Sequence, residues 1–309
     1  MNVKSHSSAE EVSVSEFGRL SRKIDSIWPG NRVPVTSIFE VPLGDSGRVN
    51  GIQDFLGIRI IHLSDLQGAI FGTDNRDILE RVAECDPHLI VVTGDLVDRR
   101  MVRIAEFEPS IQLMCSLQNI APVFFTYGNH ERSFPPQVVD ELRRKMENYG
   151  ITVLDGEVTT VKLLNGNGDN IKIFIAGLEE DILMVEGKNR TKKNSDVDMT
   201  ALNKSLETMM SEAEDIAFHV KILLAHEPQF IHEYAQFGFD LIFSGHAHGG
   251  QIRIPGIGGL FSPGQGFFPK LTSGVHSAGK GIMIISRGLG NSSFPFRIFN
   301  RPEIVSVKI

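Results

Sequence analysis

The sequence predicts an α/β protein built around a parallel or mixed β-sheet. Short runs of Ile, Val, Leu and Phe recur from residue 56 onward, and each run stops at a cluster of polar residues and glycines. These runs are continuously apolar rather than alternating, which is typical of strands covered on both faces. Segments with helical periodicity separate the early runs, so strands and helices alternate along the chain.

The apolar runs predict eight strands, at Ile58–Leu63, Leu89–Thr93, Val123–Tyr127, Ile171–Gly177, Val220–Ala225, Leu241–Ser244, Ile282–Ser286 and Ile304–Ile309. Helical periodicity predicts helices at Arg76–Glu84, Pro109–Leu117, Pro136–Asn148 and Ala201–Ile216. The Asn-Gly steps within Asn165–Asn170 favour the positive backbone dihedrals of a hairpin turn. We therefore expect an antiparallel hairpin between residues 158–164 and 171–177.

The chain has neither an internal repeat nor an interdomain linker, and its 309 residues suffice for one large core. Residues 1–45 are polar and weakly patterned apart from the apolar patch Val35–Val41. We predict that they form an arm or a first strand lying over a single domain of residues 46–309. Residues 186–200 are charged and are expected to form an exposed loop.

Composition excludes several classes of protein. With 31 Lys and Arg against 38 Asp and Glu, the net charge of −7 disfavours binding to long nucleic acids. The only cysteines, Cys85 and Cys115, fall in helical stretches, which excludes a disulfide framework or a cysteine-rich zinc site and favours a reducing compartment. Residues 1–17 contain neither an apolar h-region nor a twin-arginine pair, and no run of about 18 apolar residues occurs in the sequence. We expect a cytoplasmic protein with at most peripheral membrane contact.

Polar residues that can hold a metal ion follow five of the predicted strands. They are Asp65, Asp95, Asn129 with His130, His226, and His246 with His248. In open α/β sheets the carboxyl ends of the strands meet along one crevice, so we expect these side chains to lie together. Carboxylate oxygens mixed with imidazole nitrogens suit Mn, Fe or Zn better than Ca or Mg.

In this order the motifs resemble those of the calcineurin-like metallophosphoesterases. The resemblance rests on Asp65/Gln67, Gly94-Asp95 with Asp98, Gly128-Asn129-His130-Glu131, His226 and Gly245-His246-Ala247-His248. It extends over residues 56–309, because the stretches 249–255, 262–270 and 287–292 look like the YkuE/YaeI-like branch. The resemblance implies a four-layer αββα sandwich, in which two mixed sheets are flanked by helices.

The resemblance also implies a dinuclear metal site bridged by Asp95. One ion would bind Asp65, Gln67 and His248, and the other would bind Asn129, His226 and His246. A hydroxide bridging the two ions would act as the nucleophile, and clamping by two ions suits in-line displacement at phosphorus. The resemblance implies that His130 contacts the phosphate and either stabilises the transition state or protonates the leaving oxygen. We also expect Asn129 to contact the phosphate, and Gly249 and Gly250 to let the backbone approach it closely.

Gln67 departs from the family pattern, in which most members have His. An amide oxygen is a weaker donor than imidazole, so we expect weaker occupancy at that ion or a shifted metal preference, toward Mn. Mn is therefore our first choice for the two ions, with Fe, Zn, Co or Ni as alternatives.

Simpler explanations exist for several of these residues. Asp65 and Asp95, seen singly, would be helix caps, but as members of a set they are expected to be ligands. Asp98 either caps its loop or orients a histidine, and the two options have equal weight. Glu131 is given no role in orienting His130, and His62 is interpreted as a hydrogen-bonded core residue. The loop Phe267-Phe268-Pro269 is interpreted as local packing, with a lipid- or base-stacking wall as the alternative.

The sequence thus predicts a metal-dependent hydrolase of phosphate esters, with phosphodiesters favoured by the YkuE/YaeI-like resemblance. One alternative is a pyrophosphatase acting on a UDP-sugar or on UDP-2,3-diacylglucosamine. Another, of a different class, is a catalytically weak metal-binding scaffold. The expected partner is a small phosphodiester or a sugar-nucleotide, and the oligomeric state is left open.

Overall fold

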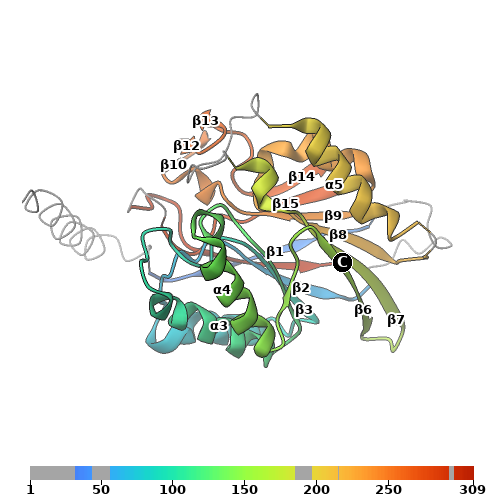
Figure 1. Cartoon of the computed structure of the whole chain (residues 1–309), viewed down its shortest axis with the longest axis horizontal. Helices are drawn as coiled ribbons and strands as arrows, with labels where there is room; N and C mark the ends of the chain where they lie inside the picture. The colour runs from blue at the N-terminus through green and yellow to red at the C-terminus, as the bar shows by residue number, and fades with distance from the viewer. Residues whose placement is uncertain (1–31, 44–55, 185–196, 215, 292–295) are drawn as a thin grey trace, which may run out of the picture.

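The computed structural model describes residues 32–43, 56–184, 197–214, 216–291 and 296–309. Two six-stranded sheets pack face to face, and helices cover the outer face of each sheet (Figure 1). The fold is therefore the four-layer αββα sandwich that the resemblance implies.

The first sheet has the strand order β1-β16-β2-β3-β4-β5. Its strands are β1 (Val35–Glu40), β2 (Arg59–Leu63), β3 (Leu89–Thr93), β4 (Val123–Thr126), β5 (Thr152–Val153) and β16 (Glu303–Lys308). Strands β2 to β5 are parallel, and β16 runs antiparallel to β2. The last strand of the chain thus lies inside the sheet, between β1 and β2.

The second sheet has the strand order β14-β15-β9-β8-β7-β6. Its strands are β6 (Glu157–Leu164), β7 (Asn170–Gly177), β8 (Val220–Leu224), β9 (Leu241–Ser244), β14 (Gly274–Ala278) and β15 (Gly281–Ile285). The four central strands β15, β9, β8 and β7 are parallel, and an antiparallel strand closes each edge. The three histidines predicted as metal ligands follow its neighbouring strands β8 and β9.

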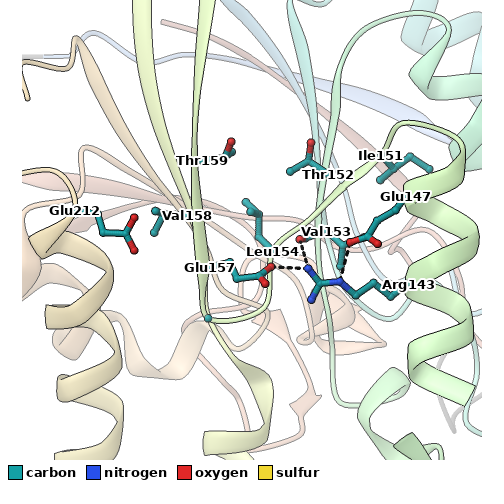
Figure 2. Close-up of a pocket in the computed structure, with 11 residues that line it drawn as sticks. Arg143, Glu147, Ile151, Thr152, Val153, Leu154, Glu157, Val158, Thr159 and Glu212 are labelled. Carbon is teal, nitrogen blue, oxygen red and sulfur yellow. Dashed lines mark hydrogen bonds and ion pairs between the residues drawn. The ribbon is translucent and has the colours of Figure 1, made fainter. Parts of the chain in front are cut away.

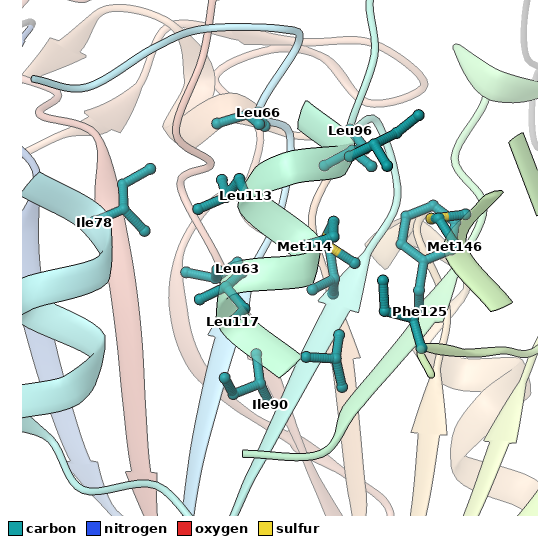
Figure 3. Close-up of a cluster of buried hydrophobic side chains, with 14 of the residues drawn as sticks. Leu63, Leu66, Ile78, Ile90, Leu96, Leu113, Met114, Leu117, Phe125 and Met146 are labelled. Atoms are coloured by element: carbon teal, nitrogen blue, oxygen red, sulfur yellow. The ribbon is translucent and has the colours of Figure 1, made fainter. Parts of the chain in front are cut away.

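Burial on both faces explains the continuous apolar runs. In β2, Ile60 points into the core between the two sheets, whereas the next residue, Ile61, points into the outer core beneath the helices. Three helices cover the first sheet, namely α2 (Arg76–Glu84), α3 (Glu108–Gln118) and α4 (Pro136–Asn148). Figure 3 shows their Ile78, Leu117 and Met146 among the strand residues of this core. On the second sheet, α5 (Met199–Ser211) and α6 (Ile231–Tyr234) take the same position.

All eight predicted strands are present, and the hairpin expected around Asn165–Asn170 is formed by β6 and β7. The patch Val35–Val41 forms β1, which pairs with β16, so this part of the predicted arm is a strand of the first sheet. The sequence reasoning missed β5, β14 and the short strands β10 (Arg253–Ile254), β11 (Gly258–Gly259), β12 (Phe261–Ser262) and β13 (Gly266–Phe267). The rest of the arm, apart from residues 32–43, and most of the loop at 186–200 lie outside the described residues, so the division at residue 45 stays a prediction.

Candidate metal centre

The carboxyl ends of parallel strands from both sheets meet at one end of the sandwich. Asp65 and Asp95 follow β2 and β3, and Asn129 follows β4, all in the first sheet. His226 follows β8, and His246 with His248 follows β9, in the second sheet. The structure brings all of these side chains into one buried cluster.

One part of the cluster gathers around His226. Its Nε2 atom lies 3.4 Å from Asp95 Oδ2 and 3.2 Å from Asn129 Oδ1. The Nδ1 atom of His246 lies 3.0 Å from the same asparagine oxygen and 3.2 Å from His226 Nε2. Asn129, His226, His246 and Asp95 are the residues predicted to hold the second ion, and their ligating atoms face one another.

The other part of the cluster gathers around Asp65. Its Oδ1 atom lies 3.3 Å from His248 Nε2, and its carboxylate accepts the backbone N–H of His246 at 3.1 Å. Asp65, Asp95 and His226 each offer a ligand atom, and these three atoms all lie within 4.8 Å of one another. The two predicted ion sites are therefore adjacent and share the Asp95 region.

Hydrogen bonds around His226 show that the cluster fits a cation. The Nδ1 atom of His226 lies 2.6 Å from the carbonyl oxygen of Thr93, which can only accept, so Nδ1 carries the proton. In the neutral ring Nε2 then holds a lone pair that faces two further acceptors, the oxygens of Asn129 and Asp95. Converging lone pairs repel one another, and a divalent cation between them turns this repulsion into coordination.

The charges of the site favour the same conclusion. Burial by itself lowers the pKa of His226, but the carboxylates of Asp95 and Asp65 outweigh it and raise this pKa well above its ordinary value. In the absence of an ion the proton takes the place of the cation. Burial raises the pKa of Asp65 to about 6 and lowers that of His246 to about 3. The charged form of each side chain is therefore unfavourable in the buried site unless a partner of opposite charge is present.

The backbone of the site is strained. Asp65, Gln67, Asp95, His246 and His248 all have positive φ angles, between 46° and 62°. Side chains other than glycine rarely adopt this left-handed conformation, and it clusters at functional sites when the surrounding structure holds it. Two neighbouring loops meet here, because Asp65 N–H donates to Gly94 O at 3.0 Å and Gln67 N–H to Asp95 O at 2.8 Å.

Gln67 lies beside the carboxylate that is predicted to bridge the ions. Its Nε2 atom donates to Asp95 Oδ2 at 2.7 Å, whereas its Oε1 atom is buried with no hydrogen-bond partner. Rotation of the amide exchanges these two ends and turns the unsatisfied oxygen toward Asp95 and the adjacent ion site. The position therefore accommodates an oxygen ligand.

His130 lies at the edge of the cluster, with Nε2 3.8 Å from Asp95 Oδ2. Its Nδ1 atom accepts the backbone N–H of Arg99 at 3.2 Å. In the neutral ring the proton is therefore on Nε2, the atom that faces the site. Burial lowers the pKa of His130, which favours this neutral form.

Glu131 supports the site in a way that the sequence reasoning missed. Its buried carboxylate accepts the backbone N–H groups of Asp95 at 2.8 Å, Gly128 at 2.9 Å and Val97 at 3.0 Å. It does not orient His130, in agreement with the prediction, but it ties the Asp95 loop to the Asn129 loop. Burial and the nearby Asp95 raise its pKa to about 7 against the effect of these donors. The only sequence signal was its place next to His130.

Two further buried groups lie behind the histidines. The Glu227 carboxylate has one oxygen 4.0 Å from His246 Nε2, and burial raises its pKa to about 8. Arg297 is fully buried, donates to the carbonyl oxygens of Gly290 and Arg287, and places Nη2 3.4 Å from His248 Nδ1. Burial lowers the pKa of Arg297 to about 10. No motif pointed to either residue.

The remaining predicted residues have clear surroundings. Asp98 accepts from Arg100 N–H at 2.8 Å and pairs with its guanidinium, and it lies 4.0 Å from His130 Nδ1, so it stabilises its own loop. His62 is a core residue, as predicted, with Nε2 2.8 Å from Thr93 Oγ1.

Gly249 lies close to the side chain of Asn300. A Cβ atom at Gly249 would lie 2.3 Å from Asn300 Oδ1, so the backbone of Gly249 closely approaches Asn300. The role of Gly249 in phosphate binding stays a prediction.

A separate hollow of about 540 Å³ lies at the sandwich edge where β5 and β6 face each other (Figure 2). Arg143 on its wall donates to Glu147 Oε1 at 2.8 Å and to Glu157 Oε2 at 2.7 Å. The hollow contains none of the predicted ligands, so it does not belong to the metal centre.

Within the described residues, no helix has the length and apolar character needed to cross a membrane.

The chain is similar in sequence to known phosphoesterases. The family model described as calcineurin-like phosphoesterase matches residues 58–250. The metallophosphoesterase YkuE of Bacillus subtilis is 29% identical over 252 residues, which cover 81% of this chain and 78% of YkuE. Phosphodiesterase YaeI of Escherichia coli is 24% identical over 259 residues, or 81% and 82% of the two chains. The crystal structure of TT1561 of Thermus thermophilus is 11% identical, covers 75% of this chain and 90% of TT1561, and has a TM-score of 0.46.

Proposed function

Because the chain belongs to the calcineurin-like phosphoesterase family, we propose that it is a metal-dependent hydrolase whose substrates are phosphodiesters. One observation carries the proposal: seven side chains predicted as ligands, from both sheets, converge on one buried cluster of acceptor atoms. The name of the relative YaeI, a phosphodiesterase, supports diesters over monoesters.

The residues of the cluster divide into two ligand sets joined by Asp95. Asp65, Gln67 and His248 would hold one ion, and Asn129, His226 and His246 the other. Two divalent ions held there would supply Lewis acidity and lower the pKa of a bound water. Mn is our proposed metal, because the amide of Gln67 is a harder and weaker donor than imidazole.

His130 is the proposed proton donor. Its tautomer is set by the backbone N–H of Arg99, which occupies Nδ1 and leaves a proton on Nε2. That proton faces the cluster, where it can pass to the oxygen of the departing alcohol. Glu131 holds the Asp95 loop against the Asn129 loop during this proton transfer.

A second candidate is hydrolysis of a UDP-sugar or UDP-2,3-diacylglucosamine at its pyrophosphate. The exposed side chains of Phe267 and Phe268 favour it, because they can stack on a base or contact an acyl chain. The same ligand cluster would carry out both reactions.

Turnover by metal-stripped protein tests the proposal. We expect bis(p-nitrophenyl) phosphate to be hydrolysed only after Mn²⁺ is added, faster than p-nitrophenyl phosphate, and not at all by the Asp95→Asn variant. Faster cleavage of the monoester would refute the preference for diesters. Cleavage of UDP-sugars alone would favour the second candidate, and no turnover with Mn, Fe, Zn, Co or Ni would favour a metal-binding scaffold.

A further inference from the structure

The segment after β9 differs in charge from the rest of the chain. Between Asp240 and Glu303 the sequence contains no Asp or Glu. The same segment contains six basic residues, Arg253, Lys270, Lys280, Arg287, Arg297 and Arg301. All 38 acidic residues of this acidic protein therefore lie elsewhere. Arg297 is buried and Arg287 pairs with Glu303, so the exposed basic residues of this segment are Lys270, Lys280 and Arg301. Exposed Lys and Arg in a segment without carboxylates indicate a surface that can meet negative charge.

The same segment exposes large apolar side chains. We define the loop face as six of them, Ile257, Phe261, Phe267, Phe268, Ile298 and Phe299. Phe267 is 73% exposed, Ile257 66% and Phe268 58%. Four of the six are phenylalanines, which globular proteins seldom leave in water together. Exposed apolar groups clustered in this way mark a surface that contacts another molecule or a membrane.

Hydrogen bonds join the segments that carry the loop face into one unit. Strand β10 pairs with β11, and Arg253 N–H donates to Ile298 O at 2.9 Å. Leu260 N–H donates to Ile252 O at 2.8 Å, and Phe268 N–H donates to Leu260 O at 2.9 Å. Figure 1 shows the short strands β10, β12 and β13 beside one another at one end of the second sheet. The six side chains therefore belong to one continuous surface structure.

The surrounding structure holds the exposed phenylalanines of the loop face in defined conformations. The rings of Phe261 and Phe267, which are opposite each other in β12 and β13, meet edge to face at 5.3 Å. Phe268 and Phe299 have φ angles of 53° and 52°. A positive φ is costly for a bulky residue and persists where the surroundings impose it. Both phenylalanines are thus held in exposed positions at a cost to stability.

The loop face adjoins the metal centre. Asn300, next to Phe299, donates to the carbonyl oxygen of His248 at 2.7 Å. Leu260 N–H, next to Phe261, donates to Gly250 O at 3.2 Å. The exposed cations Lys270 and Arg301 lie two residues after Phe268 and Phe299, respectively. Basic and apolar groups therefore border the end of the sandwich that carries the predicted ligands.

We propose that the loop face docks onto the surface of an anionic lipid membrane. Phenylalanine and isoleucine side chains insert at the boundary between headgroups and acyl chains, and neighbouring Lys and Arg bind the lipid phosphates. A single-stranded nucleic acid also binds aromatic and basic groups, but the net charge of −7 of the whole chain repels an extended polyanion. A membrane meets only one face, and its field decays within a Debye length of about 8 Å.

Vesicle binding by the full-length, Mn-loaded protein tests the proposal without any need for turnover. We expect the protein to cosediment with phosphatidylcholine vesicles that contain about 30 mol % phosphatidylglycerol, which gives the vesicle surface a negative potential. Pure phosphatidylcholine vesicles should bind at least about fivefold less, and 1 M NaCl should release most of the protein. Equal binding to both vesicles, or none to either, would overturn the proposal.

Variants locate the contact. Phe267→Ser combined with Phe268→Ser, and separately Lys270→Glu, should each weaken vesicle binding at least about fivefold. The matched control is Lys162→Glu combined with Leu164→Ser on the exposed end of the β6–β7 hairpin, which should bind as the parent does. Equal loss in the control would refute the assignment to the loop face. Tighter binding of single-stranded RNA than of vesicles, lost in the same variants, would identify a nucleic-acid surface instead.

Discussion

The two sheets contribute chemically different halves to the candidate metal centre. The first sheet supplies oxygen donors, the carboxylates of Asp65 and Asp95 and the amides of Gln67 and Asn129. The second sheet supplies nitrogen donors, the imidazoles of His226, His246 and His248. Each half follows strands of the same kind, so the difference lies only in the residues at the strand ends.

This difference separates two tasks. The first half carries the negative charge that attracts cations, and burial together with the nearby charge of Asp95 raises the pKa of Asp65. The second half consists of imidazoles, which bind a metal ion as neutral rings, and hydrogen bonds orient them, as Thr93 O orients His226. Neither half alone provides the full set of predicted ligands for either ion. The core between the sheets, to which Ile60, Val91 and Leu224 belong, brings the halves into contact, so metal binding should stabilise the packed sandwich.

The largest effect is expected from Asp95→Asn, which removes the charge shared by both ion sites. Hydrolysis of the diester should fall by about 10³-fold, and bound Mn should fall below that of the parent, because an amide cannot bridge two cations as a carboxylate does. Metal content by mass spectrometry and kcat/KM check this. Asp98→Asn in the same loop is the control and should keep its metal, and equal metal content in Asp95→Asn would contradict the bridging role.

Glu131→Gln tests how the first half is held in place. The Gln side chain would set an NH₂ group against backbone N–H donors, so the free energy of unfolding should fall by about 2 kcal/mol. Mn affinity should fall about tenfold as the Asp95 loop loosens. Urea unfolding and metal titration measure both quantities. Glu207→Gln, exposed on α5, is the control, and a variant as stable as the parent would show that Glu131 does not support the loop.

His62 is an imidazole of the first sheet that lies in the core, against Phe243 of the second. Burial lowers its pKa from 6.5 to about 3, so the unfolded chain binds more protons than the folded chain between these values. The folded state therefore loses stability as the pH falls below 6.5, by about 2 kcal/mol at pH 5. His62→Phe should remove this part of the pH dependence. Unfolding of the metal-free proteins at pH 7.5 and pH 5 checks it, and identical slopes would exclude His62 as the cause.

The smallest effect is expected from Gln67→His, which gives the first half a nitrogen donor. Metal affinity should rise by about tenfold, with a change in turnover of no more than about tenfold. Isothermal titration with Mn²⁺ and Zn²⁺ measures the affinity. A much larger gain in activity, starting from a nearly silent parent, would indicate a metal-binding scaffold rather than an enzyme suited to its own metal.

Patterns local in the chain allowed most of the fold to be predicted. Continuous apolar runs located eight strands, because burial on both faces leaves no room for polar residues. The short strands β10 to β13 escaped prediction, since their pairing depends on contacts with distant residues such as Ile298. The membership of β1 in the first sheet likewise depends on pairing with β16, at the other end of the chain.

For the metal centre, the sequence by itself determined which residues end the strands, and hence which donors are available. Only the tertiary structure decided how they face one another, because His226 and Asp95 come from different sheets and meet through sheet packing. It also decided the roles of Glu131, Glu227 and Arg297, whose hydrogen bonds and charges act on residues far away in the chain. Strand ends follow from local apolar patterns, whereas buried polar contacts exist only once the two sheets have closed on each other.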